Sequence, residues 1–151
     1  MLFNILLGFI IPWVILLFAL RNHLKLVILF TPIGAVIAFL FNEVGFQYFW
    51  GMKPIYKNVT LSALPINLGV FSVMACFICY FFTKRKVNPL VLILVFSLIL
   101  TVIEWIVVVY EILFYFNGWN IGWTYLSYVL AFVLTYGYYV LLVKYNILRK
   151  G

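Results

Sequence analysis

The chain has 151 residues, of which 68% are hydrophobic and only 9% are charged. Soluble domains carry about 25% charged residues, so this composition excludes a typical water-soluble enzyme, a disordered chain and a disulfide scaffold. Ten lysines and arginines against three acids give a net charge of +7, but these cations are dispersed along the chain. A nucleic-acid partner is not expected, because nucleic-acid-binding proteins gather their cations on one face. The lipid bilayer is therefore the expected partner and solvent.

Five apolar segments are long enough, or nearly so, to cross a bilayer, since a helix spans the ~30 Å hydrocarbon layer in about 20 residues. In chain order they cover residues 2–20, 24–41, 64–82, 89–110 and 123–143. The first has no basic flank or small-residue cleavage site, so we expect a retained membrane segment. All five are too long and too evenly apolar for barrel strands. The sequence predicts an all-α polytopic transmembrane bundle that forms a single domain over residues 1–151.

The longest connection covers residues 42–63, between the second and third predicted helices. It contains Gly45, Gly51 and Pro54, but it is also rich in aromatic residues such as Phe49 and Trp50. An aromatic segment of this kind is not expected to be a free linker. We expect it to lie on the membrane surface or to fold over the mouth of the bundle.

The distribution of lysine and arginine in the loops predicts the orientation, because cytoplasmic loops carry the excess. Two of the ten cations, Lys53 and Lys57, fall on one side of the predicted bundle. The other side receives the remaining eight, which are Arg21, Lys25, Lys84, Arg85, Lys86, Lys144, Arg149 and Lys150. We therefore expect the N-terminus outside and the C-terminus in the cytoplasm. Trp50, Trp119 and Trp123 then fall near the outer interface, where aromatic belts lie.

Each predicted helix carries a stripe of small or weakly polar residues at helical spacing. The first helix has Asn4, Gly8 and Pro12, and the third has Pro65, Gly69, Ser72, Cys76 and Cys79. The fourth helix has Ser97, Thr101, Glu104 and Glu111, and the fifth has Thr124, Tyr128, Ala131, Thr135 and Tyr138. Such stripes mediate helix packing in membranes, and they can also line a cavity. The strongly polar side chains belong to the expected outer half, and they are Asn4, Asn42, Glu43, Gln47, Asn67, Glu104, Glu111 and Ser127.

Glu104 is the strongest single candidate for a functional residue, because it lies inside a membrane segment, about 7 Å outward of the middle of that segment. An ionised carboxylate there costs on the order of 2 to 3 kcal/mol on insertion scales. The side chain is expected either to be held neutral as a hydrogen-bond donor or to meet a partner. Such a partner is exemplified by Asn42, Asn67 or a lysine of the long connection. A functional acid and a structural hydrogen-bonding group are both open at this point.

Further polar residues complete a candidate ligand-binding set on the outer side. With Glu104 it comprises Glu111, Glu43, Gln47, Asn42 and Asn67, and the counter-charges Lys53 and Lys57 lie in the long connection. Such a site suits a cation, a proton or an amine-bearing ligand. Solvated interfacial charges, or two Glu–Lys pairs that close the connection onto the bundle, explain the same residues.

Other chemistry is weakly represented in the sequence. Cys76 and Cys79 have C-x-x-C spacing but lie inside a membrane segment, so packing is the expected role. His23 is the single histidine and aspartate is absent, which excludes a histidine metal cluster and a Ser-His-Asp triad. We predict no catalytic residue, no metal and no cofactor.

Three short motifs support a resemblance to a known family. Residues 64–69 (LPINLG) open the third predicted helix, Glu104-Trp105 lies in the fourth, and residues 117–119 (NGW) precede the fifth. With the five-segment layout, they resemble an uncharacterised family of small integral membrane proteins from endospore-forming, low-GC Gram-positive bacteria. The resemblance implies a bacterial cytoplasmic membrane, and it implies no catalytic or binding residue.

Three functions are compatible with these observations. The leading hypothesis is a non-enzymatic protein that binds a membrane protein partner, a second copy of itself or a lipid through an outward-facing polar site. The alternative is a small carrier or sensor for a cationic ligand or a proton, with Glu104 as the central group. A membrane-embedded enzyme that modifies lipid is the third hypothesis, and it requires acids close together around an open pocket.

Overall fold

The computed structural model describes residues 1–84 and 87–148. Within these ranges it has five helical spans that are long and apolar enough to cross a membrane. Their bounds are Leu2–Ala19, Leu24–Tyr48, Thr60–Lys84, Pro89–Val109 and Ile121–Lys144. The predicted helical bundle with five spans is thus confirmed. Arg85, Lys86, Arg149 and Lys150, which contribute to the predicted charge asymmetry, lie outside the described residues.

Two of the five spans are interrupted by a π-helical turn. The first comprises α1 (Leu2–Ile5), the π-helix η1 (Leu6–Ile10) and α2 (Ile11–Ala19). The third comprises α4 (Thr60–Ile66), η2 (Asn67–Phe71) and α5 (Ser72–Lys84). The remaining spans are the single helices α3 (Leu24–Tyr48), α6 (Pro89–Val109) and α7 (Ile121–Lys144).

The connection predicted over residues 42–63 is shorter than expected. Helix α3 continues to Tyr48, about two turns beyond the predicted end. The third span begins at Thr60 instead of residue 64. The prediction was wrong here because polar residues such as Asn42, Glu43 and Gln47 end an apolar run, yet they do not prevent a helix from continuing past the hydrocarbon layer.

Asparagine side chains determine where α6 and α7 begin. Asn88 accepts a hydrogen bond from the amide of Leu90 at 2.9 Å, and Pro89 occupies the first helical position. Asn120 accepts one from the amide of Gly122 at 2.9 Å. This cap starts α7 at Ile121, two residues earlier than its apolar run predicts.

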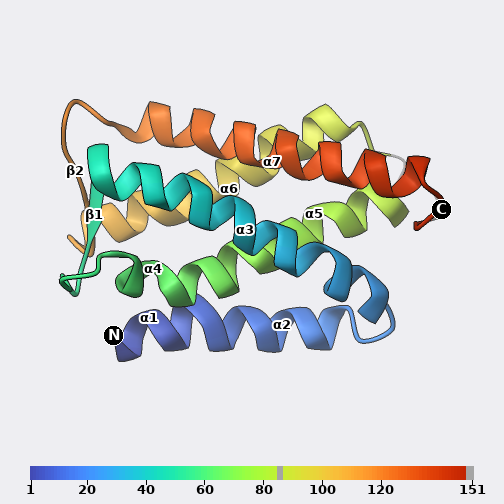
Figure 1. Ribbon diagram of the computed structural model, residues 1–151, viewed down its shortest axis with the longest axis horizontal. Helices are drawn as coiled ribbons and strands as arrows, with labels where there is room; N and C mark the ends of the chain where they lie inside the picture. The colour runs from blue at the N-terminus through green and yellow to red at the C-terminus, as the bar shows by residue number, and fades with distance from the viewer. Residues whose placement is uncertain (85–86, 149–151) are drawn as a thin grey trace.

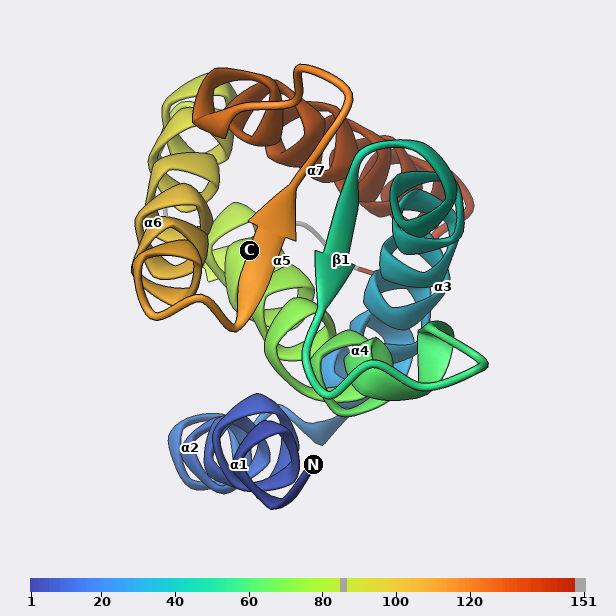
Figure 2. The same cartoon turned by 90° about the vertical axis from the view of Figure 1, so that its left-hand side faces the viewer.

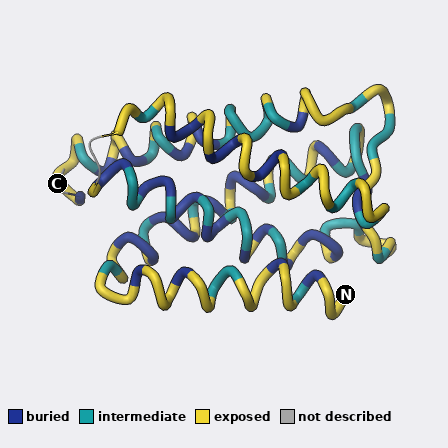
Figure 3. Tube along the Cα trace, turned by 180° about the vertical axis from the view of Figure 1, so that it is seen from behind, coloured by how far each residue is buried: buried dark blue, intermediate teal, exposed yellow. Residues whose placement is uncertain are grey.

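The five spans run side by side, and α1 begins at the opposite end of the bundle from the end of α7 (Figure 1). The third span is the most central, with 56% of its apolar window buried, against 17% for the first. Figure 3 shows that the first span is exposed along most of its length. Helix α5 packs against α2, α3, α6 and α7, so the core forms around it.

The first and third spans cross where both have a π-helical turn. Gly8 of η1 and Gly69 of η2 meet there, and the backbones approach so closely that a methyl group on Gly69 would overlap the Gly8 carbonyl. Trp13 Nε1 donates to the backbone oxygen of Leu68 at 2.8 Å beside this crossing. The crossing attaches the otherwise peripheral first span to the bundle.

A short two-stranded sheet closes one end of the bundle, and we call it the cap. It pairs β1 (Trp50–Met52) with β2 (Leu113–Tyr115) in antiparallel register, with Trp50 opposite Tyr115. Figure 2 shows the two strands lying across this end, between the surrounding helices. Asn117 Nδ2 donates to the backbone oxygen of Tyr48 at 2.8 Å and ties the β2–α7 connection to α3. The connection after α3 thus folds over the mouth of the bundle, one of its two expected placements.

Candidate binding cavity beneath the cap

A cavity of about 690 Å³ lies directly beneath the cap. Its walls come from all five spans and from both strands, and they are predominantly apolar. This volume lies within the roughly 300–1,000 Å³ range of small-molecule sites. The polar side chains on its walls are few, and they are Asn4, Asn42, Trp50, Glu104, Tyr110, Thr124, Ser127, Tyr128 and Thr135.

The cavity reaches the side of the bundle between the first span and α6. Phe3 and Leu7 line it on one side, and Ile103 and Ile106 line it on the other. These four side chains are 42–54% exposed, so they also form part of the outer apolar surface. Helix α1 packs on α4, whereas α6 packs on α5 and α7. The opening therefore faces the direction in which lipid would lie.

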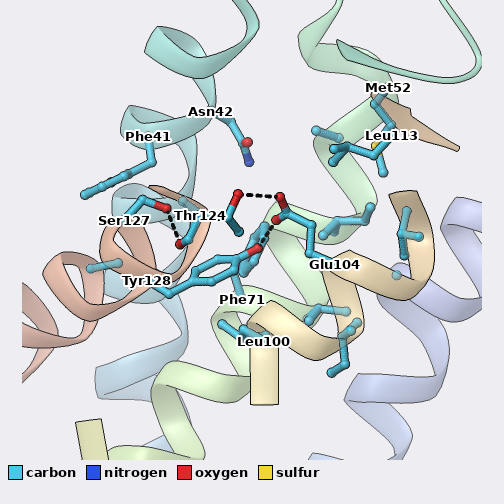
Figure 4. A pocket seen from close by; sticks show the side chains of 18 of the residues that line it. Phe41, Asn42, Met52, Phe71, Leu100, Glu104, Leu113, Thr124, Ser127 and Tyr128 are labelled. Carbon is cyan, nitrogen blue, oxygen red and sulfur yellow. Dashed lines mark hydrogen bonds between the residues drawn. The ribbon is translucent and has the colours of Figure 1, made fainter. Parts of the chain in front are cut away.

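Glu104 lies on the cavity wall, and Figure 4 shows its carboxyl group beside the hydroxyl groups of Thr124 and Tyr128. The hydroxyl group of Tyr115 is the third one at this carboxyl group. The Tyr115 hydroxyl donates to Oε1 at 2.5 Å, and the Tyr128 hydroxyl donates to Oε2. Thr124 Oγ1 lies 3.2 Å from Oε1 and 2.9 Å from the Tyr115 hydroxyl. Trp119 Nε1 donates to Thr124 Oγ1 at 2.9 Å. The cap, through Tyr115, and α7 thus both hold the Glu104 side chain in place.

The partners of Glu104 differ from those expected. Asn42, Asn67 and a lysine of the long connection were predicted, but the hydrogen bonds come from hydroxyl groups. Over residues 1–84 and 87–148, the single salt bridge is that of Lys53 with Glu111, at 3.9 Å. Glu104 therefore has no cation beside it within the described part of the chain. The prediction was wrong because its partners belong to α7 and β2, and only the tertiary structure brings these to α6.

Asn42 and Asn67 form a second polar network near the cavity. Trp50 Nε1 donates to Asn42 Oδ1 at 3.2 Å, and Asn42 Nδ2 donates to Asn67 Oδ1 at 2.5 Å. This order of donors determines how both amides are oriented. Asn67 is fully buried, and its Nδ2 has no hydrogen-bond partner among the described residues. Asn42 lines the cavity, whereas Asn67 lies behind the wall and positions Asn42.

Glu43 and Gln47 lie outside the cavity. Both are exposed on α3 and contact each other, with Gln47 Nε2 donating to Glu43 Oε1 at 3.4 Å. Thr60 Oγ1 donates to Glu43 Oε2 at 3.3 Å. These contacts connect α3 to the start of the third span, so they have a structural role.

Glu111 and the two lysines of the connection also lie outside the cavity. The Glu111 side chain is 86% exposed, and it pairs with Lys53, which is 55% exposed. Lys57 is exposed as well. One of the two expected Glu–Lys pairs is therefore present, and a pair this exposed contributes at most about 1 kcal/mol. The three glutamates do not converge on one site.

Tyr115 is the main residue that the sequence did not single out. It lies in the connection between two membrane segments, and as one of the eleven tyrosines of the chain it carries no distinguishing signal. Thr124 and Tyr128 lie on the predicted inward stripe of the last helix. Their spacing of four residues placed both on one helix face, but it did not predict that they bind the Glu104 carboxyl group. Burial raises the pKa of Tyr115 above its ordinary value, and the neighbouring Glu104 carboxylate raises it further.

Metal and paired-carboxylate chemistry receive no support from the geometry. No cluster of three or more histidine, cysteine or acidic side chains that could hold a metal occurs among the described residues. Glu104 is the single acid on the cavity wall, whereas general acid–base catalysis by carboxylates uses a pair. Comparison of the chain with protein-family models, with curated proteins and with solved structures finds no match.

Proposed function

We propose that this chain is a non-enzymatic membrane protein whose cavity binds the hydrocarbon part of a lipid or another amphiphile. The observation that supports this function is the cavity itself. It is large and apolar, its lining includes partly exposed side chains of the first span and of α6, and it contains a polar site at Glu104. An amphiphile has the same division into an apolar chain and a polar group.

We propose further that the protein resides in a bacterial cytoplasmic membrane with the cap outside. The bacterial assignment rests on the resemblance of three short motifs. The orientation rests on the positive-inside rule. Lys53 and Lys57 follow β1 at the capped end, whereas Arg21 and Lys25 lie in or beside the turn between α2 and α3, and Lys144 ends α7. The ligand would then enter from the outer leaflet.

The cavity favours the lipid-binding form of the leading hypothesis over the protein-binding form. A protein partner requires a surface, whereas a cavity beneath a cap accommodates a hydrocarbon chain. The enzymatic hypothesis loses support because Glu43 and Glu111 lie away from Glu104's cavity. The carrier or sensor hypothesis keeps one observation in its favour, which is the buried Glu104.

Narrowing the cavity tests the proposed function. Ala131 lines the cavity from α7, so the Ala131→Phe variant places a ring inside it. Ala19→Phe is the matched control, because Ala19 is exposed at the end of α2 and does not line the cavity. Both variants and the wild type are extracted gently, and lipid that remains bound is quantified by native mass spectrometry.

We expect the wild type and Ala19→Phe to retain one amphiphile per chain and Ala131→Phe to lose it. Thermal unfolding of each detergent-solubilised variant checks that Ala131→Phe remains folded. Equal retention by all three proteins, with all three folded, would contradict the proposed function.

A further inference from the structure

We infer that the cavity selects amphiphiles with a cationic head, such as an alkylammonium group, and that Glu104 supplies the counter-charge. This inference rests on the proposed function and specifies the chemistry of its ligand. It requires that Glu104 act as an anion, that the protein supply no cation of its own, and that the surroundings suit an ammonium group.

The hydrogen bonds around Glu104 match those of an ionised carboxylate. Such a group is an acceptor only, with lone pairs for about four donors. Tyr115 and Tyr128 donate one hydroxyl to each carboxyl oxygen, and Thr124 is placed to donate to Oε1. Trp119 donates to Thr124 and leaves the threonine hydroxyl free to donate onward. Donors therefore approach both oxygens, and one acceptor position remains for a ligand.

A buried anion in an apolar cavity requires a partner of opposite charge. Charges removed from water cost several kcal/mol unless they are paired. No described cation lines the cavity, and Lys53, which follows β1, is 55% exposed and pairs with Glu111. An ammonium group from the ligand would complete the site, since it brings both a positive charge and N–H donors.

The aromatic side chains near Glu104 favour a cation as well. The rings of Phe71 and Tyr128 are 5.8 Å apart and both line the cavity, and Trp50 lines it from the cap. Aromatic faces attract ammonium groups, and the attraction grows when water is excluded. A carboxylate among aromatic rings therefore recognises an amine better than it recognises a neutral or an acidic head group.

The test compares three ligands that share one chain and differ in the head. A brominated twelve-carbon chain is used as the amine, the alcohol and the carboxylate, and bromine quenches tryptophan fluorescence where the chain binds near Trp50. The protein is placed in nanodiscs of phosphatidylcholine at neutral pH. Wild type, Glu104→Gln and Glu111→Gln are titrated with each ligand, and saturable quenching gives the affinities.

We expect the wild type to bind the amine at least about tenfold more tightly than the alcohol, the effect of one charge-assisted contact. Glu104→Gln should bind the amine and the alcohol with equal affinity, because the charge that distinguishes them has been removed. Glu111→Gln, altered at an exposed carboxylate, should keep the wild-type preference.

Two results would overturn the inference while leaving the proposed function intact. One is equal affinity of the wild type for amine and alcohol, and the other is an amine preference that survives in folded Glu104→Gln. If none of the three chains quenches the wild type saturably, the proposed function fails and the inference fails with it. Even if Glu104→Gln does not fold, the affinities of the wild type for the three head groups show whether the cavity prefers a cationic head.

Discussion

At the scale of single residues, the three glutamates of this chain have three different environments. Glu43 contacts Thr60 at an exposed position, and Glu111 pairs with Lys53 in solvent. Glu104 alone enters the cavity, where hydroxyl groups replace the water that the other two keep. Position along a membrane segment predicted that Glu104 differs from the others. It did not predict the identity of its partners, because they lie 11, 20 and 24 residues away in the chain.

The Tyr115 hydroxyl makes stability depend on pH in the alkaline range. Its pKa is raised in the folded protein, so the unfolded chain, with a pKa near 10, releases this proton first. The stability that Tyr115 contributes is therefore fully present below about pH 10 and is lost as pH rises above that value. The Tyr115→Phe variant should therefore lose less stability at alkaline pH than the wild type does.

Thermal unfolding in detergent between pH 8 and about pH 11 measures this difference. Tyr145→Phe is the control, because Tyr145 is exposed at the end of α7 and its loss should leave the wild-type profile unchanged. If Tyr115→Phe and the wild type lose the same stability at alkaline pH, the Tyr115 hydroxyl is not the group that makes stability depend on pH.

At the scale of elements, the contact between the first and third spans depends on two glycines in π-helical turns. The small residues Gly8 and Gly69 were part of the predicted stripes, and helical periodicity placed them on inward faces. The π-helical turns were not predicted, because they have no sequence signature and occur where two backbones pack closely. Local hydrogen bonds determine where helices begin, because the side chains of Asn88 and Asn120 accept hydrogen bonds from amides in the first turn of α6 and of α7.

Gly69→Ala should weaken this crossing. The added methyl group would overlap the carbonyl oxygen of Gly8, a backbone atom that cannot rotate away. Overpacking of this kind costs about 1–3 kcal/mol. Gly137→Ala is the matched control, since a methyl group there meets no atom within 4 Å. Alanine in that exposed helical position should stabilise α7 by up to about 1 kcal/mol.

Chemical unfolding in mixed micelles measures both glycine variants against the wild type. We expect Gly69→Ala to be less stable and to lose the first span at lower denaturant than the rest of the bundle. Similar stability of the two variants would show that the spans do not approach closely at Gly69.

At the scale of the whole molecule, charge and polarity are distributed along the bundle axis. The cap, the cavity and Glu104 occupy one end, and the connection between α2 and α3 occupies the other. At that second end Lys25 Nζ donates to the backbone oxygen of Ile147 at 2.6 Å, which connects the start of α3 to the chain after α7. The end of the bundle that holds Glu104, a polar residue of the predicted outer half, is therefore also the end that carries the cap and the cavity.

The proposed orientation predicts which loops face the outside of the cell. Lys57→Cys, in the exposed connection after α3, should react with a membrane-impermeant maleimide in intact cells. Asn22→Cys, in the exposed turn before α3, should react only after the membrane is permeabilised. The native Cys76 and Cys79 are buried and should remain unlabelled, so the parent chain is the control. The reverse pattern of labelling would invert the orientation and place the cap in the cytoplasm.

The sequence by itself determined the environment of this protein, its five spans and the separation of its charges. These follow from composition and from local runs of residues, because a bilayer excludes charge and demands helices of a certain length. The tertiary structure alone decided that β1 pairs with β2, that hydroxyl groups of α7 and β2 surround Glu104, and that a cavity remains beneath the cap. Each of these depends on contacts between residues far apart in the chain, and apolar segments in lipid have no pattern that specifies which of them meet.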